Sequence, residues 1–346
     1  MVAEASKFRL KKSHKQPLCQ VRFGPSGAFL VSADSGGLLR LWPRGTAKGR
    51  RDIYSKGSPL TGAWFSEDGR WLLAGHQGGT AALFVLPKGK PVARLRLKSG
   101  AGPGFQILSG TSRPILDWTI LAVVPAGGPS MWITLEAREF FTVDNRDFSV
   151  IAHHKHSGNL IDCVAGARDE GLVFFGDDLG YIYRYRFADD RLEFFAVHRE
   201  LVSVIDGRNH RSEDIRAAEV TALALSPDKQ RLASCGRNGG IRIWEAGAAV
   251  GPLESAEKRT PVHERQSTAA RRVRSAAFLA DGRSLVFGLE DGCVETWDFF
   301  ADRWRTLTTL PAGVRALDIS PDLSLLAVGD ESGGIYVFPF DSVFPK

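Results

Sequence analysis

The stretch VTALALSPDKQRLASCGRNGGIRIWE, residues 220–245, decides the fold of this chain. It opens with an alternating apolar run that ends in Ser-Pro-Asp, a combination typical of a strand entering a tight turn. Two further apolar runs follow, RLASC and IRIW, and Asn-Gly-Gly in the turn between them is typical of a β-hairpin. The segment therefore predicts three consecutive antiparallel strands.

The same pattern recurs along most of the chain. Its first half returns as LCQVRFGPSG (18–27), LTGAWFSEDG (60–69), VRSAAFLADG (273–282) and VRALDISPDL (314–323). Its second half returns as FLVSADSGGLLRLW (29–42), WLLAGHQGGTAALF (71–84), LVFFGDDLGYIYRY (172–185), LVFGLEDGCVETW (285–297) and LLAVGDESGGIYVF (325–338). A glycine stands five residues before the last aromatic residue in all six copies, as Gly239 does before Trp244. Glycine suits this place because the turn requires a positive φ angle.

A seventh, degenerate copy lies at residues 115–144, with Val143 at the aromatic position and Arg138 in place of the glycine. The copies end at positions 42, 84, 143, 185, 244, 297 and 338, which are 41 to 59 residues apart. The pattern therefore has a basic unit of about 42 residues, with insertions in three of the connections.

A unit of this length with about four strands resembles the WD40 repeat, and the resemblance covers nearly the whole chain. It implies an all-β fold, a closed seven-bladed β-propeller of four-stranded antiparallel blades in one domain, residues 1–346. The expected blade cores are residues 18–42, 60–84, 115–143, 160–185, 220–244, 273–297 and 314–338. Trp42, Trp244 and Trp297 are expected to pack between blades.

The chain departs from the family pattern in two respects. Only Trp297 is followed by the family's Asp, and the Gly-His pair that usually opens a repeat is missing. These departures remove sequence support for the family's internal hydrogen-bond network of His, Ser, Asp and Trp, but not for the fold. Closure of the ring is expected at the chain ends, where residues 6–12, SKFRLKK, would form the outermost strand of the last blade and remove an open edge.

Composition favours an ordinary water-soluble protein. Apolar residues make up 43% and charged residues 24% of the 346 residues, and no apolar run is long enough to span a bilayer. Four cysteines, at positions 19, 163, 235 and 293, lack metal-ligand spacing, so we expect buried, reduced thiols and a cytoplasmic location. The net charge of +6 permits an acidic partner without requiring one.

The sequence contains few candidate metal-binding or catalytic residues. His153, His154 and His156 are the most metal-like local group, but no acidic or cysteine ligand lies close in sequence, so a solvated outer strand or loop is the favoured interpretation over a metal site. Catalytic and phosphate-binding motifs such as GxSxG, HExxH and GxxxxGKS are absent. We therefore expect no cofactor, no bound metal and no enzyme activity. An enzyme whose residues converge from separate blades remains an alternative.

Basic residues gather where the innermost strands begin. In rings of the resembled family, this end of the strands surrounds the channel mouth and is the usual surface for partners. The expected partner-binding residues there are Arg272, Arg274, Arg315, Lys11, Lys12 and Lys15, joined by Arg271, with Trp118 as a further candidate anchor. The competing interpretations are solvated loop charges for the cations and burial for Trp118. Glu290, Asp291, Asp330 and Glu331 are expected on the same face, where they would cancel part of the field.

The resemblance implies a non-enzymatic scaffold for protein–protein interaction that uses this face and the inserted loops, and that docks an acidic or phosphorylated segment of a partner protein. Binding of nucleic acid or of an anionic membrane surface through the basic sector is an alternative. Membrane recognition is ranked low because the phosphoinositide-binding FRRG motif is absent. The two long connections, 197–219 and 247–271, are polar, and the second is expected to be a mobile surface excursion. Membership of a larger complex stays open.

Overall fold

The computed structural model describes residues 8–9, 13–44, 46, 48–54, 59–66, 68–77, 80–98, 104–107, 120–126, 130–135, 139–144, 150–155, 161–167, 172–186, 191–205, 211–250, 252–266 and 271–340. In this part of the chain the elements are almost all β-strands, and the helix is α1 (Leu253–Glu257). None of its helices is long and apolar enough to cross a membrane.

The strands form seven antiparallel sheets in chain order. Sheet 1 is β2 (Leu18–Phe23), β3 (Phe29–Asp34), β4 (Leu38–Pro43) and β5 (Arg51–Tyr54), and sheet 2 is β6 (Leu60–Phe65), β7 (Trp71–His76), β8 (Thr80–Val85), β9 (Lys90–Lys98) and β10 (Gly104–Ile107). Sheet 3 is β11 (Ile120–Ala126), β12 (Ser130–Leu135), β13 (Glu139–Asp144) and β14 (Val150–Lys155), and sheet 4 is β15 (Ile161–Ala167), β16 (Leu172–Asp177), β17 (Tyr181–Arg186) and β18 (Arg191–Val197).

The remaining sheets follow the same plan. Sheet 5 is β21 (Val220–Leu225), β22 (Arg231–Gly236), β23 (Gly240–Glu245) and β24 (His263–Gln266), and sheet 6 is β25 (Val273–Phe278), β26 (Ser284–Leu289), β27 (Cys293–Asp298) and β28 (Arg303–Thr309). Sheet 7 is β29 (Val314–Ile319), β30 (Leu325–Asp330), β31 (Ile335–Pro339) and β1 (Phe8–Arg9). A separate hairpin, β19 (Arg199–Ile205) and β20 (Arg211–Ala217), lies between sheets 4 and 5 in sequence.

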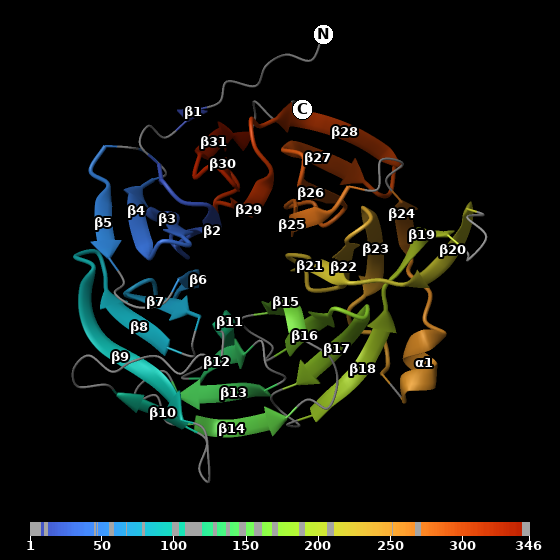
Figure 1. Cartoon of the computed structure of the whole chain (residues 1–346), viewed down its shortest axis with the longest axis horizontal. Helices are drawn as coiled ribbons and strands as arrows, with labels where there is room; N and C mark the ends of the chain where they lie inside the picture. The colour runs from blue at the N-terminus through green and yellow to red at the C-terminus, as the bar shows by residue number, and fades with distance from the viewer. Residues whose placement is uncertain are drawn as a thin grey trace.

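The first strands of the sheets contact one another in sequence order. They make the series β2, β6, β11, β15, β21, β25 and β29, and β29 in turn contacts β2. Figure 1 shows the seven sheets following one another around a common centre, with the first strand of each on the inside. Each sheet thus packs its two faces against its neighbours, and the repeated apolar runs supply the residues for those contacts.

The N-terminal strand belongs to the last sheet, as the sequence predicted. Phe8 pairs with Val337 and Arg9 with Tyr336, so β1 covers the outer side of β31. Further along, the Ser13 hydroxyl accepts a hydrogen bond from the Ile335 amide at 3.3 Å. Two segments more than 300 residues apart in sequence therefore share one sheet, and an otherwise open edge is paired.

The tryptophans at the ends of the repeats lie between sheets. Trp42 has 0% of its surface exposed, and it packs with Ala327 and Val337 of sheet 7. Trp244 packs against sheet 4 and Trp297 against sheet 5, each with 2% exposure. These side chains are core residues, as expected, and their burial stabilises the contacts between neighbouring sheets.

The second long connection is more ordered than its composition predicted. Residues 252–266, within the expected mobile excursion, contain α1, which contacts β18, and β24, which completes sheet 5. The Arg259 side chain donates to the Phe195 carbonyl at 2.6 Å, and buried Arg184 donates to the Ala248 carbonyl at 2.9 Å. The expectation of mobility was wrong for this part, because β24 is an outer strand, where polar residues serve as well as apolar ones.

Candidate functional site

Two arginines occupy equivalent places in neighbouring sheets. In each of the seven sheets, the pairing of the first strand with the second shifts register directly after the first residue of the first strand. In sheet 6, for example, Val273 pairs with Leu289, but the next pair is Ser275 with Gly288. Arg274 is therefore the extra residue of a β-bulge, and Arg315 holds the same position after Val314 in sheet 7. A bulge leaves its extra residue outside the regular pairing and re-aims its side chain. The bulges direct both guanidinium groups to the end where the first strands begin.

Acidic residues face the arginines at this end of the strands. Arg271 donates to Asp291 at 2.8 Å and to buried Glu295 at 3.1 Å. Arg272 donates to Glu219, which also accepts from Arg237 at 3.4 Å. We call Arg271, Arg272, Arg274 and Arg315, together with the acidic residues Glu219, Glu290, Asp291 and Glu331, the mouth sector.

The two bulge arginines have weaker partners. Arg274 lies 3.8 Å from Glu290, and Arg315 lies 3.6 Å from Glu331, both longer than a hydrogen bond. Both pairs are partly exposed to solvent. The mouth sector therefore combines two hydrogen-bonded arginines, Arg271 and Arg272, with two whose donors are not committed to an acid.

Electrostatics sets Arg274 apart. Burial lowers the pKa of its guanidinium, and the positive charges of Arg272 and Arg315 lower it further. The Nε atoms of Arg271, Arg272 and Arg274 are buried and have no hydrogen-bond partner among the described residues. In contrast, the hydrogen bond to Asp291 raises the pKa of Arg271. Two further cations, Arg272 and Arg315, therefore lie close to Arg274, and an anion placed there would relieve the repulsion among the three.

The other predicted partner-binding residues are less well placed. Lys15 is exposed in the segment before β2, whereas Lys11, Lys12 and Trp118 lie outside the described residues. Of the four acidic residues expected on this face, Glu290, Asp291 and Glu331 contact the arginines. Asp330 also lies at this end of the strands, opposite Val314, but it is fully buried and its carboxylate accepts the Ser332 and Gly334 amides at 2.9 and 2.7 Å.

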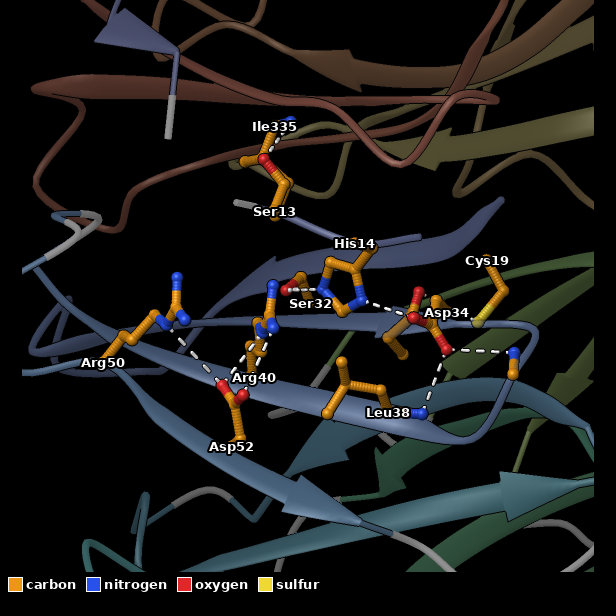
Figure 2. A network of polar contacts seen from close by, with 12 residues as sticks. Ser13, His14, Cys19, Ser32, Asp34, Leu38, Arg40, Arg50, Asp52 and Ile335 are labelled. Atoms are coloured by element: carbon orange, nitrogen blue, oxygen red, sulfur yellow. Dashed lines mark hydrogen bonds and ion pairs between the residues drawn. The ribbon is translucent and has the colours of Figure 1, made fainter. Parts of the chain in front are cut away.

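A hydrogen-bond network that lacked a sequence signature is present in sheet 1. The Trp42 indole donates to the Ser32 hydroxyl at 2.8 Å, and the His14 ring lies 2.7 Å from both Ser32 Oγ and Asp34 Oδ2. Figure 2 shows His14 between Ser32 and Asp34, with Asp34 also turned toward the Leu38 amide. His14 follows a serine instead of the usual glycine, and the missing Gly-His pair concealed it.

A related network lies in sheet 5. The Trp244 indole donates to Ser234 Oγ at 2.9 Å, and His198 Nδ1 lies 2.8 Å from the same oxygen. Glycine 236 stands where sheet 1 has Asp34, and the Glu200 carboxylate from β19 takes over the role of that aspartate. It accepts the Asn238 and Gly240 amides at 2.9 and 2.6 Å.

The next question is whether the described residues include a metal-binding group or a reactive cysteine. They contain no group of three or more His, Cys, Asp or Glu side chains that could hold a metal ion. His153 and His154 lie on β14, the outermost strand of sheet 3, and His156 is outside the described residues. Cys19 is partly buried and packs against the core of sheets 1 and 2, and desolvation raises the pKa of its thiol to about 12. This cysteine is therefore a packing residue.

Comparison with known proteins points to one family. The family model described as WD domain, G-beta repeat matches residues 6–43 and 209–245. The chain is also similar to Protein HIR1 of Yarrowia lipolytica (strain CLIB 122 / E 150), with 32% identity over 101 residues. That similarity covers 25% of this chain and 10% of the relative, so the chain spans only a small part of the relative's length.

The first matched segment contains the whole His14-Ser32-Trp42 network, and the second contains Ser234 and Trp244 of the other network but not His198. The other sheets repeat the same strand order and the same bulge without matching strongly in sequence. Residues 6–43 and 209–245 therefore match WD40 repeats, and the four-stranded antiparallel sheets of the described residues are in keeping with that family.

Proposed function

We propose that the seven sheets form one closed seven-bladed β-propeller, which acts as a non-enzymatic protein-interaction scaffold. Contacts between successive first strands, including β29 with β2, support closure, and the pairing of β1 with β31 would lock it. A rigid ring offers surfaces on which loops and strand ends present side chains, and WD40 proteins commonly use such surfaces to bind other proteins. In this proposal the whole chain is a single domain.

The mouth sector is the proposed docking surface, and its ligand is an acidic or phosphorylated segment of a partner protein. The observation that carries this proposal is the contrast within the sector: Arg274 and Arg315 have only long ion contacts, while Arg271 and Arg272 are hydrogen-bonded. Arginine supplies paired donors that match carboxylate or phosphate. An incoming anion would therefore bind Arg274 and Arg315 in place of Glu290 and Glu331.

The acidic neighbours make this surface selective in the proposal. Glu290 and Glu331 leave little net positive charge for a weakly charged partner. A phosphoryl group carries more charge than a single carboxylate and offers three acceptor oxygens, so it competes better for the two arginines. We further propose that the scaffold works in the cytoplasm, in keeping with its four free cysteines, and that it joins a larger complex.

A peptide-binding experiment tests the proposed surface. A random peptide library with a fixed central phosphoserine is compared with the matching serine and glutamate libraries, and binding is measured for Arg274→Glu, Arg315→Glu and wild type. We expect each reversal to weaken binding of selected phosphopeptides by about tenfold or more, because a charge-assisted hydrogen bond is replaced by repulsion. The control is Arg70→Glu, which makes the same charge change at an exposed arginine in the turn before β7.

Two results would contradict the proposal. The first is that selected peptides bind the reversals and wild type equally well, with unchanged melting temperatures in all variants. Alternatively, the reversals could abolish binding of short single-stranded nucleic acids while leaving peptides unaffected, with an affinity that falls steeply as salt rises. That second result would favour nucleic-acid binding by the same arginines.

A further inference from the structure

A second surface lies at the opposite end of the strands. β25 begins at Val273 in the mouth sector and ends at Phe278, and β26 begins at Ser284, so the turn that contains Arg283 is far from that sector. At this end a groove of about 670 Å³ lies between sheets 5 and 6. Its walls include Arg231, Glu245, Ala248, Val262, His263 and Phe300.

The groove contains unusually exposed apolar side chains. Phe300 is 51% exposed and Val262 is 46% exposed, and both line the same groove. Phe300 lies in the turn after β27, where the Asp298 carboxylate accepts its amide at 3.2 Å. The His263 ring lies 5.2 Å from the Phe300 ring and supports it from sheet 5. A fixed aromatic ring that remains half exposed is well suited to anchor a partner side chain.

Cations flank this ring on the rim of the groove. The guanidinium carbons of Arg231 and Arg283 each lie 5.2 Å from the centre of the Phe300 ring, within cation–π range. Arg231 also donates to the Gly282 carbonyl at 3.3 Å and contacts Asp228 at 3.5 Å. Exposed Arg283 has no ion pair among the described residues. It therefore leaves a positive charge beside the apolar surface.

Acidic residues limit what can bind. Glu245 on β23 stands opposite Arg231 on β22 in the strand register, and it lines the groove. Asp228 contacts Arg231 at 3.5 Å. These carboxylates would repel a polyanion such as nucleic acid or an anionic bilayer. A ligand with one negative charge next to an apolar group fits both the available Arg283 charge and the exposed ring.

We propose that this groove binds a partner-protein segment in which a large apolar side chain stands close to a single aspartate or glutamate. The apolar side chain covers Phe300 and Val262, and the carboxylate pairs with Arg283 and the accessible part of Arg231. This surface is independent of the mouth sector, because the two lie at opposite ends of the strands. One scaffold molecule could therefore hold two partner segments at the same time.

A selection experiment tests the groove. Random displayed peptides are selected on the full chain, and the affinity of recovered peptides is measured by fluorescence anisotropy. We expect recovered peptides that pair an apolar residue with Asp or Glu, and affinity losses of about tenfold in Phe300→Ala and in Arg283→Glu. Matched controls are Leu179→Ala, which removes an equally exposed apolar side chain (51%), and Arg70→Glu. Both controls, and Arg274→Glu, should change these affinities less than about twofold.

Three results would overturn the proposal. The first is that no recovered peptide loses affinity in Phe300→Ala while its melting temperature matches that of wild type. The second is that the peptides sensitive to Phe300→Ala are basic and bind Arg283→Glu more tightly. The third is that sedimentation shows a dimer that Phe300→Ala dissociates, which would assign the groove to a second copy of this chain. Loss of the mouth-sector function alone would leave the groove proposal intact.

Discussion

A carboxylate reaches the same two backbone amides in sheets 1 and 5, but from different places in the chain. In sheet 1 the Asp34 side chain accepts the Gly36 and Leu38 amides of its own turn. In sheet 5 the corresponding amides, those of Asn238 and Gly240, donate to Glu200 on β19. Both turns therefore have a carboxylate acceptor at the same place, although a different residue supplies it in each. An acceptor is needed because backbone N–H groups in a buried turn require a hydrogen-bond partner.

Space around Gly236 explains this exchange. A Cβ atom added at Gly236 would stand 2.5 Å from the Glu200 carboxyl carbon and 2.5 Å from His198 Nε2. The Glu200 side chain is fully buried, so it has nowhere else to go. Glycine at 236 and glutamate at 200 are therefore mutually dependent, although 36 residues separate them.

A double-mutant cycle at the residue scale tests this dependence. We expect Glu200→Ala to destabilise the fold by about 2–4 kcal/mol, since two buried amides lose their acceptor. Gly236→Asp should also destabilise alone, because it brings a second carboxylate against the first. In the double variant the new aspartate can accept the amides, so the cost should be at least about 1 kcal/mol below the sum of the single costs. Urea unfolding gives the three values, and additive costs would refute the coupling.

At the scale of single elements, the repeat pattern predicted the inner strands of the sheets but not the outer strands. The three inner strands of a sheet pack on both faces, so their apolar runs and turns were recognisable in six copies. Outer strands such as β24, with the sequence HERQ, and β28 face solvent over much of their length and carry no such pattern. β24 became part of sheet 5 only because β23 offers it an edge to pair with.

Strand β1 is the element whose removal is most informative. Deletion of residues 1–13 removes its pairing with β31 and the Ser13 acceptor of the Ile335 amide. We expect the melting temperature to fall by about 5 °C or more, because an open edge returns and the two chain ends are no longer held in one sheet. Differential scanning calorimetry measures this change. Deletion of residues 1–6 serves as the control, and equal melting temperatures for both deletions and wild type would count against locking by β1.

At the scale of the whole molecule, the described residues present two distinct surfaces on one scaffold. The mouth sector is charged and contains paired and less paired arginines, whereas the groove is centred on one exposed aromatic ring. Their placement follows from the antiparallel sheets, in which alternate turns lie at opposite ends. Binding at one surface therefore leaves the other accessible.

Stability of the whole molecule should depend on pH through the buried side chains of His14 and His198. Burial lowers the pKa of His14 and of His198 below 6.5, with the hydrogen bond to Asp34 and the charge of Glu200 acting in the opposite direction. A lowered pKa means that the unfolded chain binds more protons, so the stabilisation is complete above pH 6.5 and is lost as the pH falls toward the folded pKa values.

Urea unfolding at several pH values checks this dependence. We expect the free energy of unfolding to decrease from pH 7 to pH 5, by up to about 1.4 kcal/mol per pH unit for each histidine. The variant His14→Gln, His198→Gln should be less stable at pH 7 and should show a flatter profile over this range. A wild-type profile as flat as that of the double variant, or one that rises toward acid, would show that these histidines do not control the pH response.

The sequence by itself determined the repeating unit, the antiparallel hairpins, the burial of Trp42, Trp244 and Trp297, and the joining of the first and last strands. These features follow from local alternation, turn residues and apolar content, which act between near neighbours in the chain. Alternation also located Arg274 and Arg315 at the beginning of their strands.

Only the tertiary structure decided which arginines have a close acidic partner and which side chains complete the hydrogen-bond networks around Trp42 and Trp244. Glu219 reaches Arg272 across 53 residues, Glu200 replaces an aspartate at a distant turn, and Phe300 meets Arg231 from another sheet. Contacts of this kind depend on the packing of separate sheets against one another. Their partners are set by distance in space, which a single sequence read along its length does not contain.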